Sequence, residues 1–523
     1  MVARLPAVAQ ESATVGAGLR FGRRPVRAML RAPMPRWLND LLPIVLLLGL
    51  IVLVVGRLPH ADLGHSPAFR RRRFANWFPV GLTYAFLYMG RYNLNACIGP
   101  VFDKAQFSNI YFWGTLTYGF SFLLNGPLTD RIGGKKTIIL SAVGSLAANI
   151  ALGLVIMRAM HGGSAVPKAE QAALVPLLSA LYALNMYFQS FGAVSIVKVN
   201  AAWFHLRERG TFGGIFGILI SLGIYFAYDW SKLIMERAPA PWVFFVPAMI
   251  LAVFAVLDAI LVRDTPGQAG HEDFDLGDAS SGHTGPRMKL GEVVKQMLRS
   301  PAILTIAAIE FFSGYLRNAI LQYYRPFAEE TGRAATAAAK KAAALAVSSG
   351  LPAPEVAREF VHDNWGMLNC MAGITGGVLA GLISDRVFGS RRGPVAGLLY
   401  GVMVLGCVMM FVTLDTRLVG WVVVLMSLGI IGVHGMLSGT ASMDFGGKQN
   451  VGVVVGVIDG CVYLGTAIEA LVLGRVLPKN ELAHSATAWW TWPAVMLPAA
   501  VIGLALTTRV WHARPTKASA SAH

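Results

Sequence analysis

The sequence predicts an all-α polytopic membrane protein in which two six-helix halves surround a central cavity. Of its 523 residues, 55% are hydrophobic and only 14% are charged, whereas a soluble protein carries about 25% charged residues. Apolar runs of about 20 residues, long enough to cross a bilayer as helices, recur along nearly the whole chain. An outer-membrane barrel would instead show alternating segments of about 10 residues. The basic residues behind the net charge of +17 cluster between the apolar runs, so they do not call for a nucleic acid partner.

Residues 1–65 form a basic N-terminal extension with one short hydrophobic segment. Residues 41–55 are an apolar run of 15 residues preceded by arginines, which is typical of a secretory signal. The following Gly56–His60 offers no small-residue cleavage site and argues against that interpretation. An extra helix, a re-entrant segment and an upstream start codon remain open alternatives.

Twelve apolar spans follow, and the charges that flank them set the expected orientation. The consecutive arginines Arg70–Arg73 precede the first span and place its start in the cytoplasm. Later basic clusters fall on alternate loops, so both ends of the twelve-helix core are expected on the cytoplasmic side of a bacterial inner membrane. The expected spans are 76–98, 108–128, 137–157, 172–198, 211–230, 241–262, 301–326, 363–384, 394–414, 418–440, 450–474 and 488–511.

Composition also sets the expected domain boundaries. A stretch rich in Gly, Ser and acidic residues has no apolar periodicity and is interpreted as a cytoplasmic linker. An alanine-rich insertion after the seventh span, at about residues 327–362, favours a helix on the extracytoplasmic side. The predicted division is the extension 1–65, a first half 66–262, the linker 263–300, a second half 301–512 that contains the insertion, and a cytoplasmic tail 513–523.

Arg91 and Arg317 lie inside the strongly apolar first and seventh spans. An arginine at that depth costs at least about 2.5–3.5 kcal/mol and is tolerated mainly where it faces a cavity or a counter-charge. A weak internal repeat relates the halves, because Gly126–Lys136 and Gly381–Arg392 both carry an Asp-Arg pair and later basic residues after the second span of a half. Allowing for the insertion, the two arginines are equivalent, which predicts a central site for a doubly charged anion.

These motifs carry a resemblance to a known family over about residues 66–510. The Gly126–Lys136 loop resembles the signature of the major facilitator superfamily. Other stretches resemble helices one, four, seven and eleven of its organophosphate:phosphate antiporters, which include glycerol-3-phosphate and hexose-phosphate transporters. These stretches are Tyr84–Leu94, Phe188–Gly192 with Trp203–Gly210, Tyr315–Arg317, and Gly456–Gly465.

The resemblance implies roles for individual residues. The family arginines that coordinate phosphate match Arg91 and Arg317, and family tyrosines near the site match Tyr84, Tyr88 and Tyr463. Arginine suits phosphate because its planar fork donates two parallel charge-assisted hydrogen bonds. A phosphomonoester carries close to two negative charges near pH 7, which two arginines match. For the two tyrosines of the first span, ordinary bundle aromatics remain the alternative.

The organic part of the substrate is less well defined. A histidine and a lysine of the glycerol-phosphate branch are replaced by Ala202 and Phe122, which removes two polar groups and leaves the arginines in place. Asp459 shares a helical face with Tyr463 at i, i+4. It is expected to bind sugar hydroxyls, to pair with an arginine, or to hydrogen bond to a neighbouring helix. The sequence therefore predicts which end of the substrate is held, but not what is attached to it.

Four charged residues at the inner face are interpreted as gating residues. Asp130, Arg131, Asp385 and Arg386 begin the repeated short loops. Such charges can bridge helix ends in the outward-facing state and separate in the inward-facing state. The simpler alternative is that they only mark topology through the positive-inside bias.

Three further polar residues have open interpretations. Glu310 lies seven residues before Arg317 on the same helical face, so it is a candidate counter-charge for this arginine. Lys198 lies near the cytoplasmic end of its helix, where an extended side chain reaches water at little cost. His434 is a lone histidine in a glycine-rich helix, which is more often packed and hydrogen-bonded than a proton relay.

The sequence as a whole predicts a secondary active transporter that exchanges a phosphorylated small metabolite for inorganic phosphate by alternating access. The alternatives are a transporter-like membrane receptor for a sugar phosphate and a proton-coupled carrier of another organic anion. No nucleophile–base arrangement, metal spacing or nucleotide motif stands out, so we expect no enzyme activity, cofactor or metal. The four cysteines lie in apolar segments without redox spacing. We expect a monomer in the lipid bilayer, with no nucleic acid partner.

Overall fold

The computed structural model describes residues 64–205, 209–274, 301–349, 356–389, 391–437 and 442–512, with isolated residues at 45–53, 295–299 and 351–354. The chain divides into two compact units, residues 1–46 and 47–523, and nearly all described residues belong to the second. The hydrophobic segment predicted at 41–55, most of the linker and the tail therefore lie outside the described residues.

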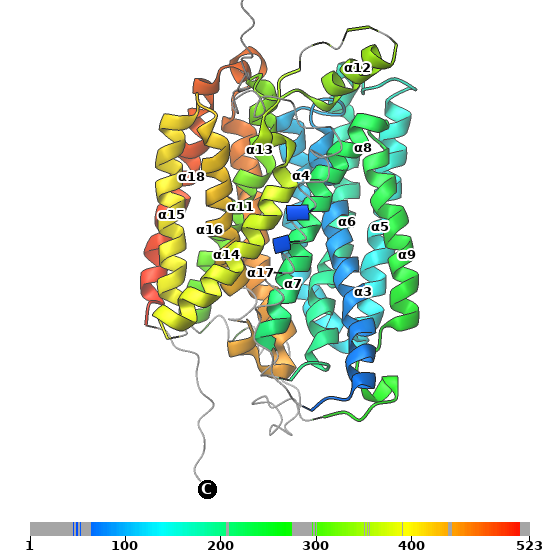
Figure 1. Cartoon of the computed structure of the whole chain (residues 1–523), viewed down its shortest axis with the longest axis vertical. Helices are drawn as coiled ribbons and strands as arrows, with labels where there is room; N and C mark the ends of the chain where they lie inside the picture. Colours follow the sequence, from blue (N-terminus) through cyan, green and yellow to red (C-terminus); the bar gives the residue numbers. More distant parts are fainter. Residues whose placement is uncertain are drawn as a thin grey trace, which may run out of the picture. The chain divides into compact units, whose positions relative to one another are not determined.

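Twelve long helices, one for each expected span, follow one another in the described part of the chain (Figure 1). A short 3₁₀ helix, η1 (Asn93–Cys97), follows the first of them, and the described residues hold no strand beyond a single bridge between Ile98 and Phe102. The long helices are α3 (Pro67–Tyr92), α4 (Lys104–Ile132), α5 (Gly134–Ala159), α6 (Lys168–Ala201), α7 (Arg209–Tyr225), α9 (Trp242–Leu261), α11 (Pro301–Glu330), α14 (Trp365–Val387), α15 (Arg392–Thr413), α16 (Leu418–Met436), α17 (Ser442–Val476) and α18 (Thr491–Arg509).

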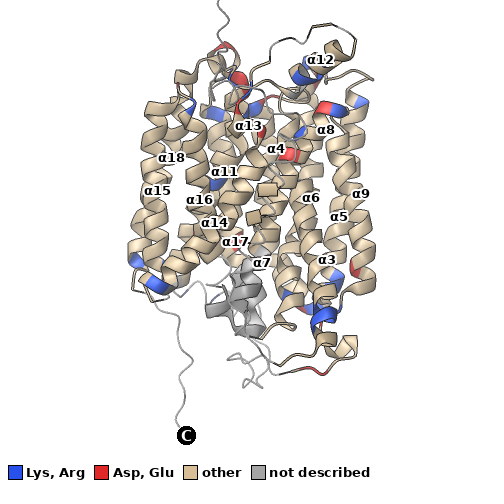
Figure 2. Ribbon diagram, viewed as in Figure 1, with Lys and Arg blue, Asp and Glu red and all other residues tan. Residues whose placement is uncertain are grey.

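Ten helical segments among the described residues are long and apolar enough to cross a membrane. The two long helices outside that set, α3 and α4, have 26 and 29 residues, which also exceeds the length a bilayer requires. Figure 2 shows the charged residues gathered at the two ends of the helices, with few of them in between. This distribution confirms the prediction of an all-α polytopic membrane protein.

The first helix begins earlier than its apolar run. The expected span began at residue 76, whereas α3 begins at Pro67. Ser66 caps it, because its hydroxyl accepts a hydrogen bond of 3.2 Å from the Phe69 amide, and proline is favoured at a first helical position. Consequently the basic run lies within the helix, and Arg72 donates to the Leu261 carbonyl at the end of α9 at 2.8 Å.

The fifth span is not one regular helix. After α7 the backbone forms a π-helical turn, η3 (Phe226–Trp230), and then continues as α8 (Ser231–Arg237). A π-turn inserts an extra residue into the helical ladder and is frequently found at functional positions. The π-turn carries Asp229, a residue of the first half whose carboxylate contacts the second half.

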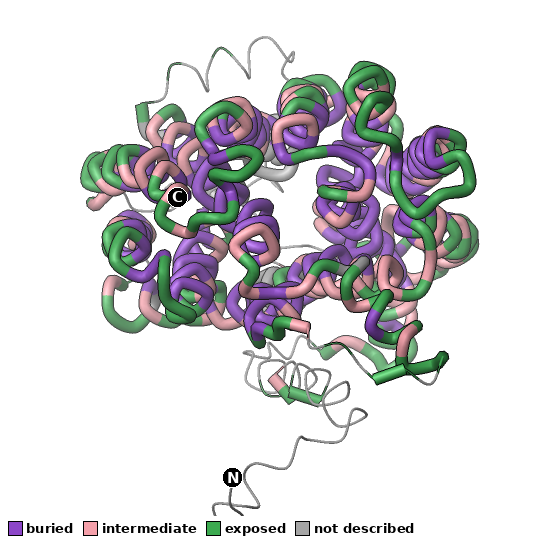
Figure 3. Tube along the Cα trace, turned by 90° about the horizontal axis from the view of Figure 1, so that it is seen from above, coloured by how far each residue is buried: buried purple, intermediate pink, exposed green. Residues whose placement is uncertain are grey.

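Two pairs of helices make most of the contact between the first six long helices and the last six. Helix α4 packs along α17, and α7 packs along α14. Seen from above, buried residues line the inward faces of the helices and many exposed ones lie outside (Figure 3). Within the second half, α11 approaches α17 closely at two glycines, since a Cβ at Gly314 would lie 1.9 Å from the Val462 carbonyl and one at Gly465 would lie 1.9 Å from that of Phe311. Such close backbone contact is typical of membrane helices with small residues at their interface.

The alanine-rich insertion contains a helix, as expected, namely α12 (Ala337–Ser348). The Thr336 hydroxyl caps it by accepting a hydrogen bond from the Ala339 amide. The helix packs against α8 of the first half and is followed by the short helix α13 (Phe360–Asp363). The insertion therefore lies against both halves.

Candidate functional site

Arg91 is completely buried near the end of α3, and three side chains satisfy its guanidinium. Its Nε donates to Gln189 Oε1 at 2.9 Å, Nη1 donates to the Tyr463 hydroxyl at 2.6 Å, and Nη2 donates to the Tyr118 hydroxyl at 2.7 Å. These partners belong to α6, α17 and α4. The rings of Tyr88 and Tyr118 also lie 4.5 and 4.4 Å from the guanidinium carbon, where the π-face attracts the cation.

The Gln189 side chain, which accepts a hydrogen bond from Arg91, is itself fixed by further hydrogen bonds. Gln189 Nε2 donates to Ser145 Oγ at 3.1 Å and to Asn185 Oδ1 at 3.2 Å. The Tyr182 hydroxyl in turn donates to the Arg91 carbonyl at 2.9 Å. All of these groups are buried, so the hydrogen bonds fix the arginine in one orientation.

Arg317 differs sharply from Arg91. It lies in the middle of α11, only 5% exposed, and its buried Nε and Nη2 have no hydrogen-bond partner among the described residues. The centroid of the Tyr463 ring lies 6.0 Å from its guanidinium carbon. Buried donors of a cation that have no acceptor are costly, so, among the described residues of the site, these two nitrogens are well placed to bind an anion.

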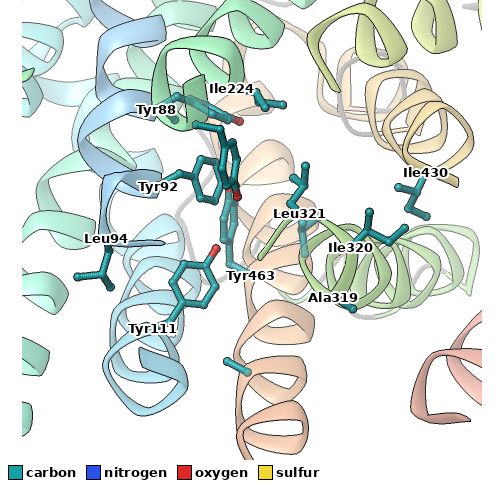
Figure 4. Packing of buried hydrophobic residues seen from close by; sticks show 14 of the residues in the cluster. Tyr88, Tyr92, Leu94, Tyr111, Ile224, Ala319, Ile320, Leu321, Ile430 and Tyr463 are labelled. Carbon is teal, nitrogen blue, oxygen red and sulfur yellow. The ribbon is translucent and has the colours of Figure 1, made fainter. Parts of the chain in front are cut away.

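The structure brings Tyr463 to both arginines, and Tyr88 to Arg91. Figure 4 shows Tyr88 of α3 and Tyr463 of α17 in one cluster with Tyr92 and Tyr111, and the ring of Tyr84 meets that of Tyr88 edge-on at 5.3 Å. All the predicted tyrosines are buried. The predicted residues thus gather around the two arginines, while their roles in binding stay predictions.

Asp459, the predicted acidic member of the site, lies one turn before Tyr463 and is half-buried. It lies near enough to Tyr118 and His434 to act on both electrostatically. This position places a carboxylate at the edge of the arginine–tyrosine cluster.

Tyr118 and Gln189 contact Arg91 directly but were not predicted as site residues. Gln189 lies within the Phe188–Gly192 stretch that resembles helix four of the family, yet no role was inferred for it. Tyr118 lies one turn before Phe122, the position where the family lysine is replaced, and their rings meet at 4.7 Å. A search one helical turn from each position singled out by the resemblance would have found it.

Glu310 does not pair with Arg317, which was one of the open alternatives. Its Oε2 lies 3.0 Å from Nδ1 of His434 on α16. Glu310 is fully buried, whereas the His434 side chain is 20% exposed. His434 is therefore the hydrogen-bonded residue that the sequence favoured, with a carboxylate as its partner.

The four predicted gating residues lie at the ends of α4 and α14. Asp130 accepts a hydrogen bond of 2.7 Å from Lys198, so this pair lies within the first half. Arg131 and Arg386 are exposed, and Asp385 lies within α14. Their gating role stays a prediction.

Among the described residues, several polar contacts join the halves at the other end of the bundle, where α4 begins and α11 ends; we call this the closed end. Lys104 of α4 forms an ion pair with Glu330 of α11 and donates to the Pro478 carbonyl at 2.9 Å. Lys232 of α8 binds the Asp363 carboxylate at 3.0 Å. Because these contacts cross from the first six helices to the last six, they hold the halves together there.

Two further residues strengthen the closed end. Lys340 of α12 forms an ion pair with Asp363, the same carboxylate that binds Lys232. Asp229 of the π-turn accepts hydrogen bonds from the Gly366 and Met367 amides at 2.7 and 2.8 Å. Since Asn364, the N-cap residue of α14, makes no side-chain cap bond, a carboxylate from the other half caps this helix.

Among the described residues, no group of three or more His, Cys, Asp and Glu side chains is arranged to hold a metal ion. The four cysteines are free. The site is instead an arginine–tyrosine cluster, and the prediction that no metal is bound stays a prediction.

A helical membrane bundle with buried arginines between its halves has the architecture of a solute transporter. A family model described as Major Facilitator Superfamily matches residues 80–469. The chain therefore belongs to the major facilitator superfamily, which confirms the predicted fold class.

Curated relatives narrow the family further. The chain is 25% identical over 446 residues to a glycerol-3-phosphate transporter of Bacillus subtilis, covering 80% of this chain and 89% of that one. It is 22% identical to a probable hexose phosphate transport protein of Chlamydia muridarum, covering 86% and 94%. It is also 20% identical to the membrane sensor protein UhpC of Escherichia coli, covering 76% and 84%. These relatives confirm the resemblance to the organophosphate:phosphate antiporters.

Solved structures share the fold at low identity. The inward-facing, unoccupied structure of a bacterial homologue of the lysosomal transporter Spinster aligns with a TM-score of 0.58 and 12% identity. The alignment covers 86% of this chain and 98% of that one. This similarity concerns the fold alone.

Proposed function

We propose that this protein exchanges a phosphorylated small metabolite for inorganic phosphate across a bacterial inner membrane, with both ends of the twelve-helix core in the cytoplasm. The metabolite is of the sugar phosphate or glycerol phosphate type, like the substrates named for two of the relatives. The protein works as a monomeric carrier by alternating access and has no enzyme activity.

The observation that carries this proposal is the contrast between the two arginines. Arg91 is already satisfied by three hydrogen bonds, whereas two buried nitrogens of Arg317 have no hydrogen-bond partner in the described part of the chain. A phosphate group offers oxygens for the free fork of Arg317 and can displace the tyrosine hydroxyls from Arg91. Two positive charges then match the nearly two negative charges of a phosphomonoester.

The exchange mechanism follows from the cost of these charges. In the empty carrier the guanidinium of Arg317 resists enclosure, because a buried cation at membrane depth costs at least about 2.5–3.5 kcal/mol. Bound phosphate offsets this cost and bridges the halves through Arg91 of the first and Arg317 of the second. The loaded carrier therefore reorients faster than the empty one. As a result, outward movement of one phosphate compound is coupled to inward movement of another.

The contacts at the closed end fit one stage of this cycle. Lys104, Asp229 and Lys232 all reach the other half there, and in the proposed orientation this end is extracytoplasmic. The described structure then corresponds to a carrier that is shut toward the outside. Opening outward requires these contacts to break.

Phosphate counterflow in proteoliposomes tests the proposal. Vesicles loaded with phosphate should take up labelled phosphate, and phosphorylated sugars, trioses and glycerol phosphates should compete. Arg317→Lys and Arg91→Lys keep the charge and lose the planar fork, so each should lower exchange at least tenfold. Arg158→Lys, at an exposed position on α5, is the matched control and should leave exchange unchanged. Exchange that survives both site substitutions undiminished would disprove the clamp.

A second candidate function is a membrane receptor, because one relative is described as a membrane sensor protein. A receptor would bind a phosphate ester at the same arginines without exchanging it. Saturable binding without counterflow in the same vesicles would favour this candidate. Uptake that is driven by a pH gradient and needs no phosphate inside would instead indicate a proton-coupled carrier.

A further inference from the structure

A histidine–carboxylate pair lies beside the arginine–tyrosine cluster, and the proposed phosphate clamp does not use it. Glu310 shares the interior face of α11 with Arg317, seven residues later, and its Oε2 lies 3.0 Å from His434 Nδ1. Arg317 and Asp459 both lie near enough to His434 to act on it electrostatically. The pair is thus a neighbour of the arginine that we propose binds phosphate.

His434 faces the interior of the bundle and not the lipid. Trp421 and Leu425 on the same helix are 49% and 50% exposed and mark its outer face. At 100° per residue, His434 lies about 140–180° from both of them around α16. Ser427 and Ile430 on the His434 side are buried. The 20% exposure of His434 is therefore exposure to interior space between the helices.

With Glu310 ionised, the pair presents a hydrogen-bond acceptor to that space. An ionised carboxylate can only accept, so Nδ1 of His434 then donates to Glu310 and Nε2 of the neutral ring is left as the acceptor. An ionised Glu310 together with Asp459 also makes this side of the site repel additional negative charge.

At the two positions where polar residues of the family are replaced, the first half has no polar side-chain group. Phe122 is fully buried and packs against the rings of Tyr118 and Tyr463 at 4.7 and 6.0 Å. Ala202 has no polar side-chain group. The acceptor on α16 is therefore well suited to recognise the part of a ligand that lies beyond the phosphate.

On the basis of the proposed function, we propose that Glu310 is ionised in the carrier and, as a positioning residue, fixes the tautomer of His434, and that His434 binds a hydroxyl group on the organic part of the transported phosphate ester. The chemical class selected is a hydroxyl-bearing phosphomonoester without a carboxylate. A hydroxyl donates to Nε2, whereas a ligand carboxylate would face the acceptor nitrogen and two protein carboxylates.

Three probes of nearly equal size test this selectivity: glycerol 3-phosphate, n-propyl phosphate and 3-phosphoglycerate. Each is used as a competitor of labelled phosphate exchange in proteoliposomes that contain the full-length protein. Glycerol 3-phosphate should compete about tenfold better than propyl phosphate, which lacks both hydroxyls, since a site built to bind a hydroxyl rejects the analogue without one. The 3-phosphoglycerate should compete least well.

Substitutions assign the selectivity to the pair. His434→Leu should bring the ratio between glycerol 3-phosphate and propyl phosphate close to one, while His434→Asn, whose carbonyl can accept, should keep part of it. Glu310→Gln should shrink the same ratio and relax the discrimination against 3-phosphoglycerate at least severalfold, because a charge is removed. Ser427→Ala, on the same buried face of α16, is the matched control and should keep the wild-type ratios.

The outcomes separate this inference from the proposed function. Absence of phosphate exchange in the wild type would contradict the proposed function. Exchange with no preference for glycerol 3-phosphate over propyl phosphate, or a preference that survives His434→Leu, would overturn the role of His434. If the histidine variants fail to insert, Glu310→Gln decides, and unchanged ratios in that variant would overturn the proposal.

Discussion

Gln189→Glu is an informative single change at Arg91, because it adds one negative charge next to the guanidinium, and Gln189→Leu controls for the hydrogen bonds that the change also removes. The wild-type amide accepts a hydrogen bond from Arg91 Nε at 2.9 Å and is held from behind by Ser145 and Asn185. A glutamate fits the same space and accepts the same bond from Arg91, but it loses the two hydrogen bonds that Gln189 Nε2 donates to Ser145 and Asn185. It adds one negative charge on the far side of the guanidinium from the proposed phosphate.

The size of the effect follows from Coulomb's law. A dianionic phosphate on the Nη side would lie about 6–8 Å from the new carboxylate, and at an effective dielectric constant of about 20 the repulsion is about 4–6 kcal/mol. Because about 1.4 kcal/mol corresponds to tenfold in an equilibrium constant, phosphate affinity should fall about 1,000-fold or more. Gln189→Leu removes the hydrogen bonds of this side chain without adding charge. It should lower the stability of the protein by about 1.5–3 kcal/mol and should change the affinity for phosphate much less.

The assay is the concentration dependence of phosphate exchange in proteoliposomes at pH 8 and pH 6, with wild type as the reference at each pH. The ratio of the KM of Gln189→Glu to that of wild type should exceed the ratio for Gln189→Leu by at least tenfold at pH 8. Protonation makes glutamate a neutral hydrogen-bonding group like glutamine, so the defect should lessen as the pH falls. Equal KM values for Gln189→Glu and wild type at pH 8 would refute the reasoning that phosphate binds at Arg91.

Three other predictions concern packing and closure. In Gly465→Ala a Cβ would lie 1.9 Å from a carbonyl oxygen of α11, so the free energy of unfolding should fall by about 1–3 kcal/mol and the Tm of the purified protein should fall with it. The control is Gly401→Ala in α15, where a Cβ meets nothing within 4 Å and the Tm should not change. Lys104→Met, which leaves Glu330 without its lysine partner, should favour opening of the closed end, seen as faster thiol labelling of a cysteine introduced near that end. Burial opposes ionisation of Asp363, but the hydrogen bond with His362 and the nearby lysines lower its pKa below the usual range. Its contribution to closure should therefore be complete above pH about 4, fall only at more acidic pH, and be absent in Asp363→Asn, as measured by cross-linking of α8 to α13.

The helices could be predicted from the sequence because each depends on a local apolar run. The predicted start of the first helix was wrong. The Ser66 cap and Pro67 lie outside the apolar run, next to a basic stretch that was interpreted only as a topology signal. The arginines could be found because their cost at membrane depth does not depend on which helices surround them.

The partners of the arginines were harder to predict, because they come from other helices. Spacing along one helix placed Tyr88 near Arg91, but it could not place Tyr118 or Gln189 there, since α4 and α6 bring them in. The same limit explains why the partner of Glu310 was not predicted. Its seven-residue spacing from Arg317 was compatible with an ion pair, and only the packing of α16 against α11 gives it His434 instead.

The Asp229 carboxylate couples the stability of the first turn of α14 to the position of the first half. While the closed end holds, the Gly366 and Met367 amides at the start of α14 have a protein acceptor. Opening takes that acceptor away, and the loss of a helix cap costs about 1 kcal/mol. The first turn of α14 should therefore loosen each time the closed end opens, so hydrogen exchange at these two amides would report whether this end is open or closed without any attached probe.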